Sequence, residues 1–135
     1  MRARLAFVLT VQLLAACAAT ACAPAAPPRP SEGAAQQAKM GAATKRYAAC
    51  VDAGAKAIDV ADDAAGSIGD RVMVACKAAR ATLMADVIAF HQIGHPKFTI
   101  DQSKAVAEVS IATIEDELRQ QTVVTIVKRQ TAGGT

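Results

Sequence analysis

His91 and His95 are the side chains whose spacing in this sequence comes closest to a metal-binding pattern. Two imidazoles four residues apart lie on one face of a helix, where they can share a zinc ion. The helical zinc motif H-E-x-x-H needs a glutamate where this chain has Gln92, and the spacing fixes no third ligand, although Asp86 and Asp101 are near in sequence. We therefore expect no metal ion and no other cofactor, with His91 and His95 as weak candidates for metal binding.

The other reactive side chains lack the order that catalysis or calcium binding requires. Asp59, Asp62 and Asp63 cluster, but a calcium loop needs alternating oxygen ligands, a glycine and a distal glutamate in a set order. The serines stand outside any G-x-S-x-G elbow, and the sequence has no glycine-rich phosphate loop. The sequence therefore favours a protein that is not an enzyme.

Cys50 and Cys76 have the features of a structural disulfide. Each lies in an alanine-rich run with helical periodicity, and the turn-like segment 62–66 lies midway between them. A disulfide between two antiparallel helices suits a small core that is built largely from alanine, in a chain with only 3% aromatic residues. A redox pair is disfavoured because no C-x-x-C is present, which leaves two buried thiols as the alternative.

The hydrophobic pattern supports the same register for this hairpin. If Cys50 faces Cys76 in an antiparallel pair, then Gly54 faces Val72, and both lie on stripes of small or apolar residues with helical spacing. Gly54 would allow the helices to approach closely, and Tyr47 on the same stripe is expected in the core.

Capping residues set the expected helix boundaries. The first helix is predicted over about residues 31–61, with Ser31 as its N-cap. The second is predicted over about residues 67–93, with Ser67 as its N-cap and Pro96 beyond its end. A mixed stripe on this second helix either faces another helix or forms an exposed contact patch, and it consists of Met73, Arg80, Met84 and Ile88.

A third helix is predicted to begin at a capping box formed by Thr99 and Gln102. Its inner face includes Ile100, and Glu115 is expected to pair with Arg119 one turn later. Residues 122–127 (TVVTIV) are β-branched, which is typical of a strand, but no partner strand is evident and we expect a frayed continuation of the helix. The predicted fold class is all-α: a disulfide-pinned antiparallel helical hairpin plus a third helix, forming a small bundle.

The N-terminus has the layout of a signal peptide. Arg2 and Arg4 precede an apolar run over residues 5–16 that is too short to span a membrane. The run ends in Leu14-Ala15-Ala16-Cys17, which resembles the lipobox of bacterial lipoproteins. This resemblance covers residues 1–17 and implies that residues 1–16 are removed, and that Cys17 is acylated and anchors the protein in a membrane.

Two alternatives for the N-terminus stay open. Ala19-Thr20-Ala21 fits an ordinary signal peptidase site, and cleavage near Ala21 would give a soluble periplasmic protein. With the lipoprotein interpretation, the absence of aspartate at Ala18 implies the outer membrane. Cys22 then has no evident partner, so it is either free or cross-linked to another chain.

The expected domain organisation follows from these boundaries. Residues 17–33 contain four prolines and form a tether, residues 34–130 form the helical domain, and residues 131–135 form a disordered tail. The formal net charge is +3, from 15 basic and 12 acidic residues, and removal of Arg2 and Arg4 leaves 13 basic residues against 12. These charges are interspersed, so we expect no nucleic-acid partner.

The sequence therefore predicts a small envelope lipoprotein that faces the periplasm and acts by contact with an envelope protein partner. A periplasmic helical carrier of a small ligand or metal is the alternative. The alanine-rich core leaves little room for a pocket, which favours the first interpretation.

Overall fold

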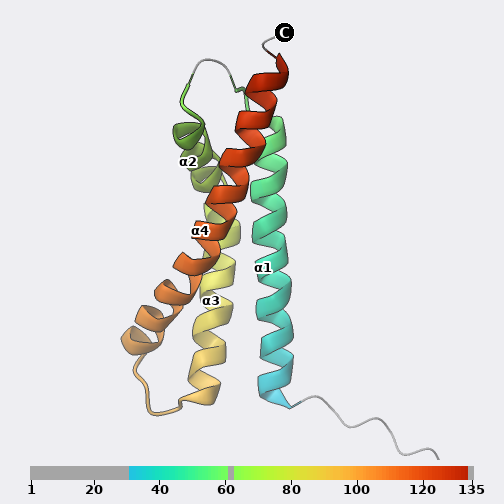
Figure 1. Ribbon diagram of the computed structural model, residues 1–135. Coiled ribbons are helices and arrows are strands. Elements are labelled where there is room, and N and C mark those ends of the chain that lie inside the picture. The colour runs from blue at the N-terminus through green and yellow to red at the C-terminus, as the bar shows by residue number, and fades with distance from the viewer. Residues whose placement is uncertain (1–30, 61–62, 134–135) are drawn as a thin grey trace, which may run out of the picture.

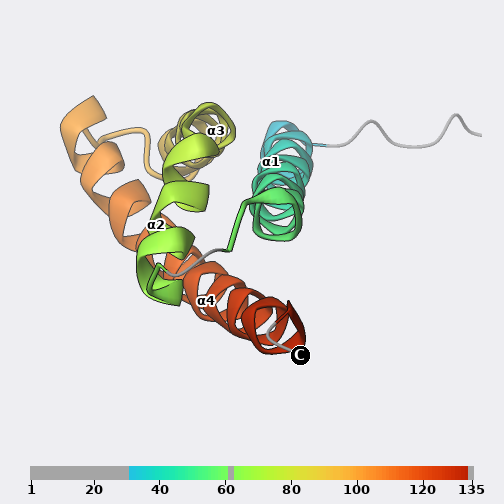
Figure 2. The same ribbon diagram turned by 90° about the horizontal axis from the view of Figure 1, so that it is seen from above.

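The computed structural model describes residues 31–60 and 63–133. Those ranges contain four α-helices and no strand: α1 (Glu32–Ala57), α2 (Ala65–Ala75), α3 (Lys77–Gly94) and α4 (Ile100–Gly133). α1 lies antiparallel to α2 and α3, and α4 crosses them obliquely (Figures 1 and 2). The predicted all-α bundle with a disulfide-pinned hairpin is confirmed. Cys17, Cys22 and the tether as far as residue 30 lie outside the described residues.

The disulfide and the predicted hairpin register are both present. Cys50 and Cys76 are joined with an S–S distance of 2.01 Å and a Cα–Cα distance of 6.0 Å. Gly54 faces Val72, because a Cβ placed on Gly54 would lie 2.9 Å from Val72 Cγ1. The missing side chain at Gly54 therefore allows α1 and α2 to approach each other here.

The second predicted helix is in fact two helices. α2 ends at Ala75 and α3 begins at Lys77, and Cys76 between them has φ −90° and ψ 15°. The N–H of Cys76 is shared between the carbonyls of Val72 at 3.3 Å and Met73 at 3.1 Å, so the helical path bends while its hydrogen bonding continues. The bend lets α2 pack mainly against α4 while α3 packs mainly against α1 (Figure 1).

Two of the three predicted caps are confirmed. Ser31 Oγ accepts a hydrogen bond from the N–H of Ala34 at 3.2 Å. Thr99 and Gln102 form the reciprocal capping box, in which the N–H of Thr99 donates to Gln102 Oε1 at 2.8 Å and the N–H of Gln102 donates to Thr99 Oγ1 at 3.2 Å. The predicted cap at Ser67 is wrong, because α2 has already begun before it.

The ends of α1 and α4 differ from the predicted ends. α1 stops at Ala57 and not near residue 61, with Ile58 already in an extended conformation. Residues 122–127 are helical, as expected. The predicted disorder after residue 130 is wrong for Thr131–Gly133, which complete α4.

Side chains near the end of α4 hold the end of α1. Arg129 donates hydrogen bonds from Nη1 to the carbonyls of Ala55 at 2.8 Å and Ile58 at 2.7 Å. Gln130 donates to carbonyls in the α1–α2 connection. Carbonyls at a helix C-terminus lack partners within the helix and carry partial negative charge, so a guanidinium group stabilises them.

The core runs along the contact between the hairpin and α4. Its buried apolar residues are Ala43, Tyr47, Val51, Ala55, Ile68, Val72, Met73, Cys76, Leu83, Val87, Ala107, Ile111, Leu118 and Ile126. Ile100 is not among them and is 59% exposed, contrary to prediction. Met73 is buried, and Met84 and Ile88 pack against the core, so the mixed stripe is internal and forms no exposed contact patch.

Gly54→Ala is expected to destabilise the protein by about 1 kcal/mol, because the new methyl group clashes with the β-branched Val72 and outweighs the gain in helix propensity. Gly41→Ala is the matched control on the same helix. Nothing lies within 4 Å of a Cβ at Gly41, so this variant should gain about 0.5–1 kcal/mol. Urea denaturation followed by circular dichroism measures both, and a stabilised Gly54→Ala variant would contradict the close packing.

Candidate functional site

In the part of the chain that the structure describes, the two histidines make no metal centre. The rings of His91 and His95 stack at the end of α3 with centroids 4.7 Å apart, and Phe98 stacks on His95 at 4.9 Å. His91 Nδ1 is buried and has no hydrogen-bond partner there. No three His, Cys, Asp or Glu side chains of residues 31–60 and 63–133 gather closely enough to hold a metal ion.

An ion network joins three helices on another face of the bundle. Arg80 of α3 donates to two carboxylates of α4, Glu115 at 2.7 Å and Glu108 at 3.0 Å. Glu115 also accepts a hydrogen bond from the hydroxyl of Tyr47 of α1 at 2.9 Å. The predicted pairing of Glu115 with Arg119 is therefore replaced by contacts between helices.

Arg119 makes a second cross-helix contact, with Asp70 of α2 at 2.9 Å. The side chains of Arg119 and Asp70 are both more than half exposed, so solvent screens this pair and it adds little stability. Arg80 and Glu115 are more enclosed, with exposed fractions of 33% and 22%. The Arg80 network is therefore the stronger electrostatic tie between α4 and the hairpin.

The Arg80 network holds its groups in fixed charge states near neutral pH. The hydrogen bond from Arg80 lowers the pKa of Glu115 from its ordinary 4.5, although partial burial acts in the opposite direction. Burial and the hydrogen bond to Glu115 raise the pKa of Tyr47, and the bonds to Glu115 and Glu108 raise the pKa of Arg80. None of these three groups exchanges a proton readily near pH 7, so their arrangement is suited to stabilisation and not to acid–base catalysis.

Glu115→Gln is expected to lower the free energy of unfolding by about 1–2 kcal/mol at pH 7, because it removes a charge-assisted hydrogen bond. Glu115 has a lowered pKa when folded, so its contribution is present above about pH 4.5 and is lost as the pH falls through the folded value. The stability difference between wild type and variant should therefore shrink below pH 4.5 in urea titrations. A difference that stays constant down to acidic pH would contradict the assigned role of Arg80.

A groove lies between α1 and α4 on the described surface. We call it the α1–α4 groove. Its wider end has a volume of about 450 Å³ and lies where the helices diverge, with Leu83, Val87 and Phe90 of α3 as its floor. The walls at this end come from α1 and α4 and consist of Gln37, Met40, Gly41, Thr44, Ser110 and Ile114.

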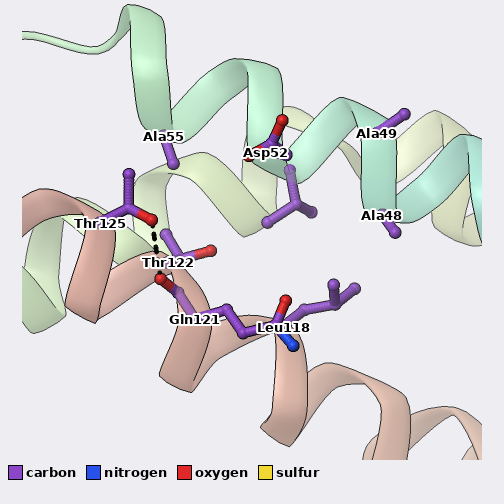
Figure 3. Close-up of a pocket in the computed structure, with 9 residues that line it drawn as sticks. Ala48, Ala49, Asp52, Ala55, Leu118, Gln121, Thr122 and Thr125 are labelled. Carbon is purple, nitrogen blue, oxygen red and sulfur yellow. Dashed lines mark hydrogen bonds between the residues drawn. The ribbon is translucent and has the colours of Figure 1, made fainter.

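We include in the α1–α4 groove a second hollow, which lies farther along the same two helices. One turn beyond Thr44 and Ile114, Ala48 and Leu118 begin a second hollow of about 300 Å³. Figure 3 shows Ala48 and Ala55 of α1 pointing toward α4, where Leu118, Gln121, Thr122 and Thr125 line the opposite wall.

The groove has an apolar interior and a polar rim. Exposed polar side chains on its edges include Gln37, Asp52, Ser110 and Gln121. Gly41 has no side chain, and Ala48 and Ala49 have only methyl groups, so the α1 side of the groove rises little above the helix backbone. Such a surface is suited to binding an apolar segment. His91 and Ser110 both line its wider end, but the Ser110 hydroxyl donates to the carbonyl of Val106 at 3.0 Å and His91 Nδ1 has no hydrogen-bond partner among the described residues, so the two do not form a nucleophile–base pair. Both hollows lie open at the surface, and neither is a closed pocket inside the thin core.

None of the helices in the described ranges is long and apolar enough to cross a membrane. Comparison of the chain with protein-family models, curated proteins and solved structures found no match.

Proposed function

We propose that this protein is a small lipid-anchored envelope protein that faces the periplasm and acts by binding, without catalysis. The lipobox-like segment ending at Cys17 supports the anchor. The α1–α4 groove supports the binding role, and we assign it to an amphipathic helix of an envelope protein partner.

The shape of the groove is the observation that carries this proposal. Its residues on α1 extend from Gln37 to Ala55, which at 1.5 Å per residue corresponds to about 27 Å of helix. An elongated apolar trough with a polar rim fits a helix that presents apolar residues every three or four positions. Low walls at Gly41 and Ala48 permit the close backbone approach that such packing needs.

A second candidate function rests on the wider end of the groove. A volume of about 450 Å³ above Leu83, Val87 and Phe90 is within the range of small-molecule sites. A carrier of a small apolar ligand would use this end alone. The two functions differ in how far along α1 and α4 the bound molecule extends.

The anchor is tested by the intact mass of the protein purified from cell membranes. We expect acyl groups on an N-terminal Cys17, and no acyl groups on a Cys17→Ala variant. An unmodified N-terminus at Cys22 or later would overturn the anchor.

The groove is tested by photo-crosslinking in cells at Ser110 and Gln121, with Val109 as the matched control. Val109 neighbours Ser110 on α4 but is 71% exposed and lies outside the groove lining. We expect a protein adduct of the same mass from Ser110 and Gln121, and none from Val109. Gly41 lines the groove and has free space around a Cβ, so Gly41→Trp should occupy the wider end of the groove and abolish the adduct, with circular dichroism as the check that the variant folds. Adducts at Ser110 alone, with a small molecule, would support the carrier instead.

A further inference from the structure

Three exposed apolar side chains lie at or near the α3–α4 connection, at one end of the bundle. Ile93 near the end of α3 is 37% exposed, Phe98 in the α3–α4 loop is 40% exposed, and Ile100 at the start of α4 is 59% exposed. We call these three residues the apolar tip. Figure 1 shows that the α3–α4 loop and the start of α1 lie at the same end of the molecule.

Contacts between α1 and α3 confirm that the chain enters the bundle beside the apolar tip. A Cβ placed on Gly33, in the first turn of α1, would lie 3.9 Å from Ile93 Cγ2. In the next turn, Gln36 donates to the carbonyl of Asp86 at 3.1 Å and to its carboxylate at 3.2 Å. The segment before Ser31 therefore joins the bundle beside the apolar tip and not at the opposite end of the bundle.

The apolar tip is held by its own contacts. The ring of Phe98 stacks on His95 at 4.9 Å, and the N–H of Phe98 donates to the His95 carbonyl at 2.9 Å. The capping box at Thr99 and Gln102 fixes the start of α4 directly after it. Phe98 is thus exposed on an ordered loop, so binding through its ring costs little further conformational entropy.

Charges near the apolar tip are few and of both signs. Lys97 adjoins Phe98, while Glu32 and Asp101 are the nearest acidic residues in sequence on α1 and α4, and all three are exposed. This mixture does not favour a strongly charged partner. Apolar and aromatic side chains can insert into the interfacial zone of a bilayer. The long side chain of a neighbouring lysine can at the same time place its amine among the lipid headgroups.

We propose that the apolar tip inserts into the interfacial region of the membrane to which Cys17 is attached, and so orients the groove above that membrane. This inference rests on the proposed anchor. The chain from Cys17 to Ser31 can span at most about 50 Å, so the apolar tip stays within reach of the lipid surface. At the high effective concentration that a short tether produces, even a weak membrane contact is occupied.

The chain contains no tryptophan, so single substitutions act as clean fluorescence reporters. Phe98→Trp reports on the apolar tip, and Val124→Trp, at a site that is 52% exposed near the other end of α4, is the matched control. Each variant is purified from membranes with its acyl groups, checked by mass and circular dichroism, and reconstituted in protein-free phosphatidylcholine vesicles. Brominated acyl chains in these vesicles quench tryptophans that enter the bilayer.

We expect emission of the Phe98→Trp variant to shift to shorter wavelength, with quenching at least about threefold stronger than in the Val124→Trp variant. The effect should persist at high salt, because the insertion depends on apolar side chains and the charges near the tip are few and of both signs. Equal quenching of both variants, on protein with confirmed acyl groups at Cys17, would overturn the insertion and leave the proposed function standing. A mass without acyl groups would overturn both, so the two failures are distinguishable.

Discussion

Tyr47→Ala is expected to lower the free energy of unfolding by about 4 kcal/mol, the largest effect of any single substitution considered for this domain. Tyr47 is fully buried and is the largest side chain among those with almost no exposed surface. Its removal leaves a cavity between α1 and the neighbouring helices. It also removes the hydrogen bond that the Tyr47 hydroxyl donates to Glu115. For a domain whose total stability is on the order of 5–15 kcal/mol, such a loss is severe.

Tyr47→Phe separates the ring from the hydroxyl. It keeps the packed ring and removes only the hydrogen bond to Glu115, which retains Arg80 as a donor, so we expect a loss of about 1 kcal/mol. Val74→Ala, at a position that is 68% exposed, should change stability by less than about 0.5 kcal/mol. Urea denaturation of all three variants at pH 7 measures these differences. Equal losses for Tyr47→Ala and Tyr47→Phe would show that the hydroxyl, and not ring burial, carries the effect.

Removal of the disulfide is expected to cost about 3.5 kcal/mol. Cys50 and Cys76 are 26 residues apart, and their link closes a loop that contains the end of α1, the connection and all of α2. Without it the unfolded chain gains conformational freedom, while the folded hairpin keeps its packing. The Cys50→Ala/Cys76→Ala double variant should therefore retain its helical circular dichroism spectrum and unfold at a lower urea concentration.

Cys22→Ala serves as the control for the disulfide, because it removes a cysteine outside the Cys50–Cys76 pair. It should leave the unfolding midpoint unchanged, and a reducing agent should lower the midpoint of the Cys22→Ala variant but not that of the double variant. Peptide mapping without reduction should recover the Cys50–Cys76 link. A link between Cys22 and either partner would contradict the hairpin register.

The local features of the fold were predictable from the sequence. Ser31 and the Thr99–Gln102 capping box act within a single turn of helix, so their neighbours in sequence are also their partners in space. The hairpin register was predictable because Cys50, Cys76 and the apolar stripes constrain the same two helices independently. The lipobox-like segment ending at Cys17 is likewise a property of sequence alone, and it remains a prediction.

Residues of α4 show what the sequence could not decide. Arg129 holds the end of α1, and Glu115 binds Arg80 of α3 and not Arg119 on its own helix. Both contacts depend on where α4 crosses the hairpin, and the helical periodicity of α4 is compatible with many crossing angles.

The α1–α4 groove and the apolar tip have the same origin. The groove exists because α4 diverges from α1 over the floor formed by α3, and the apolar tip lies beside the start of α1 because α3 ends there (Figure 1). The sequence determined the helices, their caps and the disulfide through short-range hydrogen bonding and periodicity. Only the tertiary structure decided which faces meet and which stay open, because those contacts join residues that are far apart in the chain.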